Sequence, residues 1–264
     1  MQLIETFEQY REIVSEGKQI PGVYSNCYFL PSAVRGMIDR GALYVQHIKN
    51  GILLLEREET FFRCYYYLSP DIVPEPVVLP MPAVVEFVFQ NELTDAQCAQ
   101  INCLGQMGFS LGRESARMSL PAEGAPIGDE SPAEIAEKSD LTGVLKLIED
   151  HFDPLFAYIC SEDELAEAIQ NGRVFVIRRG AEPVAALHAE CNKGVASIRH
   201  LVVSEDCRSM GYGRRLVWLY HKAFKEKARS FSHWLDRQNA AAVRLYTGLG
   251  YSFDGRYANE YILK

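Results

Sequence analysis

The chain shows the same order of helix and strand patterns twice, and this repeat constrains its fold more than any other feature. Gly41 and the apolar strand pattern after it match Gly172 and the pattern after that, at an offset of 131 positions. Further on, the stretch around Gly108 matches the stretch around Gly250 at an offset of 142, so the first copy is 11 residues shorter in its middle. Any two α/β halves share a rhythm of helix, turn and strand, so the duplication is a hypothesis that the structure must test.

Apolar periodicity predicts where the helices and strands of each copy lie. In the first copy we expect helices in 1–16, 32–40 and 93–107, strands in 42–48, 51–58, 60–68 and 82–90, and a closing hairpin over 109–120. In the second we expect helices in 133–151, 162–170, 213–229 and 239–249, strands in 173–179, 183–190, 195–203 and 230–236, and a final hairpin over 251–263.

One segment between the copies has the composition of a linker. Residues 121–132, PAEGAPIGDESP, contain three prolines, two glycines and three acidic residues, and such clusters are typical of loops. We therefore expect an α/β (α+β) protein with one domain over 1–120 and a second over 133–264.

The composition excludes several classes of protein. Apolar residues make up 48% of the chain and charged residues 23%, as in ordinary folded proteins. No apolar run approaches the roughly 18 residues of a membrane span, and the start lacks the regions of a signal peptide. The seven cysteines are scattered without a CxxC pair, so we expect reduced thiols and a cytoplasmic location. The net charge of −8 disfavours nucleic acid as a partner, and we expect no membrane partner.

A glycine-rich turn lies between a strand and a helix of the second copy. The apolar strand pattern that ends at Val203 is followed by Arg208-Ser209-Met210-Gly211-Tyr212-Gly213 and then by an amphipathic helix. Unpaired N–H groups and the helix dipole make such a junction an anion site. The run is neither a Walker loop, GxxxxGK[ST], nor a dinucleotide fingerprint, GxGxxG. RxxGxG alone is a weak signal, because glycine turns before helices are common.

A second group of residues follows the next predicted strand. Asn239 is suited to cap a helix, and Gly250 is suited to the left-handed position after it. Tyr246 lies near the end of that helix and is either a core aromatic or a functional phenol.

Together these residues resemble the GNAT acyltransferase superfamily, whose pattern is a strand, Q/R-x-x-G-x-G/A, a helix, a strand, and then Asn, Leu-Tyr and a Gly-aromatic pair. Here the last elements are Asn239, Leu245-Tyr246 and Gly250-Tyr251. The resemblance covers about 130 residues, from near Leu141 to the C-terminus. The first half resembles the same fold without the motif, since Leu104 stands in the place of Tyr246. The chain is thus similar to tandem GNAT proteins with one degenerate copy.

The resemblance implies that acetyl-CoA is the co-substrate and that it lies where two parallel strands of the second copy splay apart. The turn would hold its pyrophosphate, the first strand would pair with its pantetheine arm, and an N–H near Val202 would polarise the thioester carbonyl. The residues expected to bind it are Leu201, Val202, Val203, Arg208, Ser209, Met210, Gly211, Tyr212, Gly213, Arg214, Asn239 and Tyr246.

The resemblance also implies direct transfer of acetyl to an amine, with Tyr246 protonating the leaving thiolate. An ammonium must first lose a proton, and Glu190, His188 and His200 on the two central strands are the candidate bases. Each has a structural alternative, an exposed hairpin residue for Glu190 and hydrogen-bonded core histidines for the other two. Some relatives carry a glutamate at the position of Ser197, which leaves the base unassigned. The histidines show no HExxH or paired spacing, so we expect no metal.

We therefore expect a CoA-dependent N-acetyltransferase that acts on a small-molecule or peptide amine. The degenerate half is expected to shape the acceptor site, pack as a scaffold or form a homodimer interface. One alternative is a catalytically silent CoA-binding module for sensing or assembly. Another is an aminoacyl-tRNA-dependent transferase, which resembles a GNAT duplication but needs no pyrophosphate loop and fits poorly with the acidic charge.

Overall fold

The computed structural model describes residues 1–264, and these form two compact units. The first unit consists of Met1–Glu114 and Tyr257–Lys264, and the second consists of Ser115–Arg256. The division therefore does not lie in the segment 121–132. That segment packs on the second unit instead, because Ala122 and Ala125 are buried in its core.

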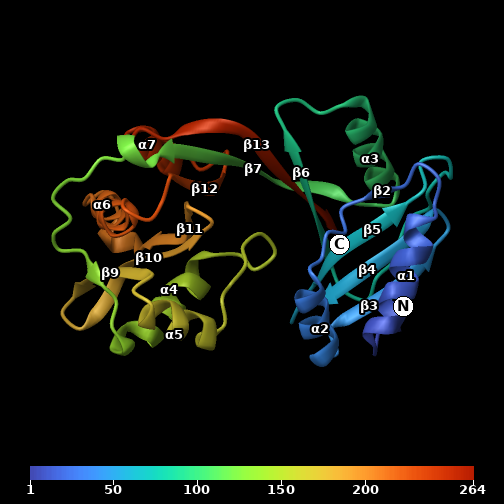
Figure 1. Ribbon diagram of the computed structural model, residues 1–264, viewed down its shortest axis with the longest axis horizontal. Coiled ribbons are helices and arrows are strands. Elements are labelled where there is room, and N and C mark those ends of the chain that lie inside the picture. The colour runs from blue at the N-terminus through green and yellow to red at the C-terminus, as the bar shows by residue number, and fades with distance from the viewer. The chain divides into compact units, whose positions relative to one another are not determined.

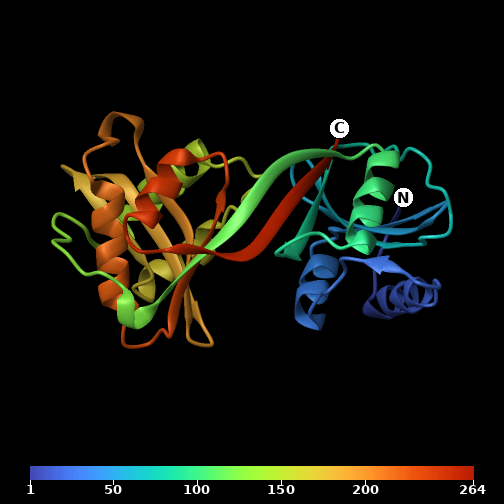
Figure 2. The same cartoon turned by 90° about the horizontal axis from the view of Figure 1, so that it is seen from above.

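The first unit is a sheet with helices on both faces. Its elements are β1 (Gln2–Leu3), α1 (Phe7–Lys18), β2 (Tyr24–Ser25), α2 (Pro31–Asp39), β3 (Leu43–Ile48), β4 (Gly51–Arg57), β5 (Phe62–Leu68), β6 (Ala83–Gln90) and α3 (Asp95–Gln106). The strand order is β1-β3-β4-β5-β6, and β2 pairs with β5. One core cluster packs α1 and α2 against β3, β4 and β5, and another packs α3 against the opposite face. Figure 2 shows this unit with α3 on one side of the blue strands and α1 and α2 on the other.

The second unit repeats that arrangement with one additional helix. Its elements are β8 (Glu134–Ile135), α4 (Leu141–His151), α5 (Glu162–Gln170), β9 (Val174–Arg179), β10 (Glu182–Asn192), β11 (Val195–Val203), α6 (Tyr212–Phe224), β12 (Ser230–Asp236) and α7 (Ala240–Thr247), with short 3₁₀ turns at Ala122–Gly124, Lys138–Asp140 and Glu205–Cys207. The strand order is β12-β11-β10-β9-β8. The helices α4 and α5 cover one face of the sheet, and α6 and α7 cover the other (Figure 1).

Two long strands each contain residues of both units. They are β7 (Ser110–Pro121) and β13 (Ser252–Leu263). Each was expected to be a hairpin, and that prediction is wrong. β7 continues as one strand through Gly112 and β13 through Gly255, and of these two glycines only Gly255 has a positive φ. As a result β7 pairs with β12 of the second unit, while β13 lies next to β6 of the first.

The backbone supports the predicted duplication at the matched glycines. Gly41 and Gly172 both follow a helix and have φ of +63° and +64°. The N–H of Gly41 donates to Ile38 at 2.8 Å, and the N–H of Gly172 donates to Ile169 at 2.9 Å, again at the offset of 131. A left-handed glycine that ends a helix suits this geometry because it has no Cβ.

The second matched pair behaves in the same way. Gly108 and Gly250 have φ of +103° and +90°, and each donates to the residue three positions earlier at 3.0 Å. Both units also contain one parallel strand pair, β5–β6 in the first and β11–β12 in the second. We therefore conclude that both halves have the same fold, and that the splayed parallel pair expected only in the second half is present in both.

Smaller differences from the predicted elements lie at helix ends. The helix expected in 133–151 begins only at Leu141, and Glu134–Ile135 instead pairs with β9. The helix expected over 213–229 ends at Phe224. None of the helices combines the length and the apolar character that crossing a membrane requires.

Candidate functional site

The central feature of the site is the place where β11 and β12 separate. Their parallel pairing runs from Val195 opposite Ser230 to Ile198 opposite His233, and it stops there. β11 itself continues to Val203. The N–H and C=O groups of its last residues therefore have no strand partner on this edge, which is the geometry that accepts an added extended group.

A β-bulge explains why the two strands separate at this position. On the other side of β11, Ile198 faces Ala189 and His200 faces His188, so Arg199 is an additional residue in the ladder. A bulge bends its strand and increases the local twist. The bend turns the end of β11 away from β12 just after their last paired residues.

The glycine turn follows the free end of β11 and starts α6. Ser209 and Gly211 have φ of +66° and +81°, and Gly211 is the N-cap residue of α6 with no side chain to cap the helix. The first backbone N–H that donates within the helix is that of Arg215, to Gly211 at 3.2 Å. The preceding N–H groups point out of the helix end, as an anion site requires. A Cβ on Gly211 would meet nothing within 4 Å, so the turn faces open space.

The second glycine of the motif has a packing role. A Cβ on Gly213 would lie 3.3 Å from Leu245 Cδ2 and 3.9 Å from Leu201 Cδ2. The first contact is tighter than side chains normally allow, so glycine at this position lets α6 approach both α7 and the end of β11. The helix N-terminus is thereby held close to the open strand edge.

The cations of the motif lie at the exposed surface around the turn. Arg208 donates from Nε to the Val203 carbonyl at 3.4 Å and pairs with Glu205 at 3.3 Å. Both side chains of that pair are more than half exposed, so the ion pair is weak and can rearrange. Arg214, one position into the helix after Gly213, is also exposed.

Tyr246 lies on α7, buried in the core on the α6 and α7 side of the sheet. Only 3% of it is exposed, and its ring centroid lies 3.5 Å from that of His233 and 5.4 Å from that of Tyr251. Burial raises the pKa of the Tyr246 phenol well above its usual value. The hydroxyl therefore stays protonated at neutral pH and is a proton donor rather than a base. Tyr246 is thus a core aromatic by packing, and its chemistry also suits a general acid.

His233 is a residue of this site that the sequence did not reveal. It is the last residue of β12 that pairs with β11, only 3% of it is exposed, and its Nε2 has no hydrogen-bond partner. Burial lowers its pKa to about 3, so it is neutral at any ordinary pH. Asn239, by contrast, caps α7 as expected, accepting the Ala242 N–H at 3.0 Å.

Comparison with known protein families agrees with this geometry. Residues 143–251 match the model of the acetyltransferase (GNAT) family, and the match includes the glycine turn, Asn239 and Tyr246. The second unit contains a GNAT domain.

Solved structures with the GNAT fold are similar to 80% or more of the chain at low sequence identity. A GCN5-related N-acetyltransferase from Sphaerobacter thermophilus matches with a TM-score of 0.56 and 12% identity over 80% of each chain. A GNAT-family acetyltransferase from Colwellia psychrerythraea matches with a TM-score of 0.54 and 12% identity, over 100% of this chain and 99% of that one. A tandem GNAT protein from the clavulanic acid biosynthesis pathway matches with a TM-score of 0.51 and 12% identity, over 81% of this chain and 78% of that one. A comparison with curated proteins finds no match. These likenesses show the fold.

The candidate bases of the GNAT domain lie on the face of the sheet opposite Tyr246. Glu190 lies on the β10–β11 hairpin, is partly exposed and pairs with Arg199 at 3.0 Å. His200 Nε2 lies 2.9 Å from the Tyr158 carbonyl, in the segment between α4 and α5. His188 faces His200 across the β10–β11 ladder. The structure therefore brings these three residues together, and separates them from Tyr246 by the sheet.

Acid stability tests the burial of His233. Its pKa is about 3 in the folded chain and about 6.5 in the unfolded chain. As pH falls below about 6.5, only the unfolded chain takes up the proton, so the folded state loses stability. His233→Phe keeps a ring but cannot be protonated. From pH 7 to pH 5 we expect wild type to lose about 2 kcal/mol more unfolding free energy than the variant, as measured by urea unfolding. Equal losses in both proteins would contradict this assignment.

Proposed function

We propose that the chain is a CoA-dependent N-acetyltransferase that transfers acetyl from acetyl-CoA to a primary amine of a small molecule or a peptide. The observation that carries the proposal is the coincidence of three features in one unit. The uncapped N-terminus of α6, the free edge of β11 and the protonated phenol of Tyr246 on α7 all belong to the second unit. All seven cysteines are free, which fits a reducing compartment such as the cytoplasm.

In this proposal each part of acetyl-CoA is assigned to residues of the second unit. The N–H groups of the turn from Ser209 to Arg214 would receive the pyrophosphate, because they have no acceptor in the helix and the turn is open at Gly211. The free edge of β11 from Leu201 to Val203 would pair with the extended pantetheine arm. Arg208 and Arg214 would add positive charge at the rim. When bound, acetyl-CoA supplies an acetyl group activated as a thioester.

Tyr246 is the group we assign to the proton that the leaving sulfur needs. Its hydroxyl proton is retained at neutral pH because burial raises the phenol's pKa. The rings of His233 and Tyr251 pack on it and fix its orientation. Such positioning favours proton transfer from the Tyr246 hydroxyl oxygen.

Two residues are proposed as alternatives for accepting the proton that the amine loses. Glu190 is part-exposed, and its pairing with Arg199 orients its carboxylate. Burial lowers the pKa of His200, so its ring is neutral at pH 7 but is a weaker base than an exposed histidine. The side chains of both lie on the α4 and α5 face, from which an acceptor would approach the open edge.

The main alternative is a GNAT-like module that binds CoA without catalysis. A module of that kind needs the turn and the strand edge but has no need of a buried phenol beside them. The presence of Tyr246 in the second unit favours the enzyme, and Leu104 at the matched position of the first unit fits a copy without activity.

Calorimetry with CoA tests the turn. Gly211→Glu places a negative charge where the pyrophosphate would lie, and we expect a loss of CoA binding in a protein that still folds. Gly172→Glu is the matched control. Gly172 lies just before β9, it also has a left-handed φ, and a Cβ there would likewise meet nothing within 4 Å. We expect wild type and the control to bind one CoA per chain. Tight binding by Gly211→Glu, or two sites per chain, would show that the site is misplaced.

Turnover with an acceptor amine tests Tyr246. Tyr246→Phe keeps the ring and removes only the hydroxyl, so we expect kcat to fall by roughly 10²–10⁴ while CoA affinity stays unchanged. Tyr220→Phe is the control, since Tyr220 is a fully buried tyrosine of the same core whose hydroxyl has no partner. If Tyr246→Phe retains wild-type turnover, the residue has a packing role only.

A further inference from the structure

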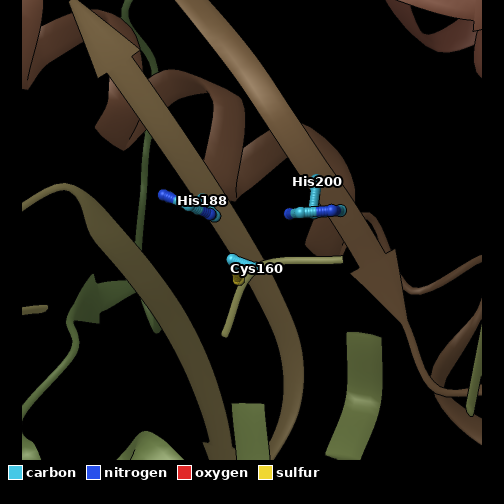
Figure 3. Close-up of side chains that lie close together, drawn as sticks. All are labelled: Cys160, His188 and His200. Carbon is cyan, nitrogen blue, oxygen red and sulfur yellow. The ribbon is translucent and has the colours of Figure 1, made fainter. Parts of the chain in front are cut away.

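A second group of reactive side chains lies on the opposite face of the sheet from Tyr246. Cys160, His188 and His200 lie close together (Figure 3), and each offers one potential ligand atom that lies within 4.8 Å of those of the other two. All three residues are buried. The group is therefore enclosed by protein and is not a chance gathering of surface residues.

Three separate elements hold these side chains in place. The β10–β11 ladder sets His188 opposite His200, with ring centroids 5.6 Å apart and the ring planes inclined by 26°. Cys160 comes from the segment between α4 and α5, directly before Ser161, which caps α5. The carbonyl of Tyr158 in that segment also accepts a hydrogen bond from His200 Nε2 at 2.9 Å. The segment and the sheet thus fix one another.

Two nitrogen atoms of the group are buried without a partner. They are Nδ1 of His188 and Nδ1 of His200, in residues of which 6% and 4% are exposed. Buried polar atoms are nearly always hydrogen-bonded, so two orphaned nitrogens side by side require an explanation. For His200 the bond from Nε2–H to the Tyr158 carbonyl leaves the lone pair on Nδ1. A histidine held by a carbonyl in this way is the usual arrangement of a metal ligand.

We propose that Cys160, His188 and His200 bind a divalent transition metal ion, with Zn²⁺ as the best fit. One thiolate and two imidazoles are donors of the type that zinc prefers. Bonds of about 2.0–2.3 Å join ligand atoms that are up to ~4 Å apart, so small rotations of the three side chains close the remaining gap. Three protein ligands leave a fourth position for water or a small ligand.

The protonation states of the group suit this ion. Burial lowers the pKa of His188 to about 4, and it also lowers the pKa of His200, so both rings are neutral and able to coordinate at pH 7. Burial raises the pKa of the Cys160 thiol, so metal binding must displace its proton.

Charged groups of both signs surround the group. The charges of Arg173 and Arg199 interact electrostatically with the histidines. The carboxylates of Glu149, Glu164 and Glu190 interact electrostatically with the cysteine or the histidines. The additional positive charge of a zinc–thiolate centre is therefore faced by three carboxylates and two guanidinium groups.

The sequence predicts no metal because the three residues have no motif spacing. They are separated by 28 and 12 positions, and only the strand register and the path of the α4–α5 segment bring them together. A metal on Nδ1 of His200 would occupy the lone pair that a general base needs, which leaves Glu190 for that role. The metal site does not depend on the proposed acyl transfer.

Cobalt substitution tests the site directly, because Co²⁺ reports a thiolate ligand through a near-ultraviolet charge-transfer band. We would treat the full chain with a chelator and titrate it with Co²⁺. We expect one Co²⁺ per chain, a thiolate band, visible bands of tetrahedral intensity, and loss of all of them on addition of Zn²⁺. Absence of the thiolate band in folded wild type would overturn the proposal.

Two variants assign the signal to Cys160 and His188. Cys160→Ser should abolish the thiolate band, and His188→Gln should weaken Co²⁺ binding at least tenfold. Cys191→Ser is the matched control, because this cysteine is on the same strand as His188 but packs in the core on the other face, and it should retain the band. The thermal midpoint of wild type and Cys191→Ser should also rise with Zn²⁺, while that of Cys160→Ser should not. A thiolate band or a Zn²⁺-dependent midpoint that survives in Cys160→Ser would place the metal elsewhere.

Discussion

The end of the β11–β12 ladder at Ile198 and His233 is the constraint on which the site depends. The bulge at Arg199 bends β11 away from its neighbour, and this leaves a backbone edge with unpaired hydrogen-bonding groups. Such an edge is unfavourable unless water, a ligand or another strand satisfies it. The glycine turn and α6 follow that edge in the chain, and Gly213 lets the helix end pack against it. Cofactor binding, in this view, completes a sheet that the fold leaves open.

The two units differ in the element that carries the proposed site. Both have a parallel pair and matched left-handed glycines. Between the parallel strands, however, the first unit has residues 69–82 without a helix, whereas the second has α6. Without that helix there is no uncapped N-terminus at the strand edge and no anion site. The degeneracy of the first copy is therefore a loss of one element and not only of one motif.

The sequence predicted the features that depend on local residue order. Strand patterns, the glycine turn and the Asn239 cap were all visible because each is set by neighbours in the chain. Features that depend on tertiary pairing were not visible. Gly112 and Gly255 resemble turn residues, yet β7 and β13 run straight through them to pair with distant strands. The cluster of Cys160, His188 and His200 likewise depends on a strand register and on a segment that returns to the sheet, and no spacing in the sequence encodes it.

Hydrogen–deuterium exchange with and without CoA tests the central claim most directly, because it reports individual backbone N–H groups. If CoA completes the open edge of the second unit, protection should appear in two segments, 199–203 of β11 and 209–214 of the glycine turn. Residues 62–90 of the first unit, which contain its own parallel pair, should exchange at the same rate with and without CoA. Protection in that segment, or none in 199–214, would contradict the account.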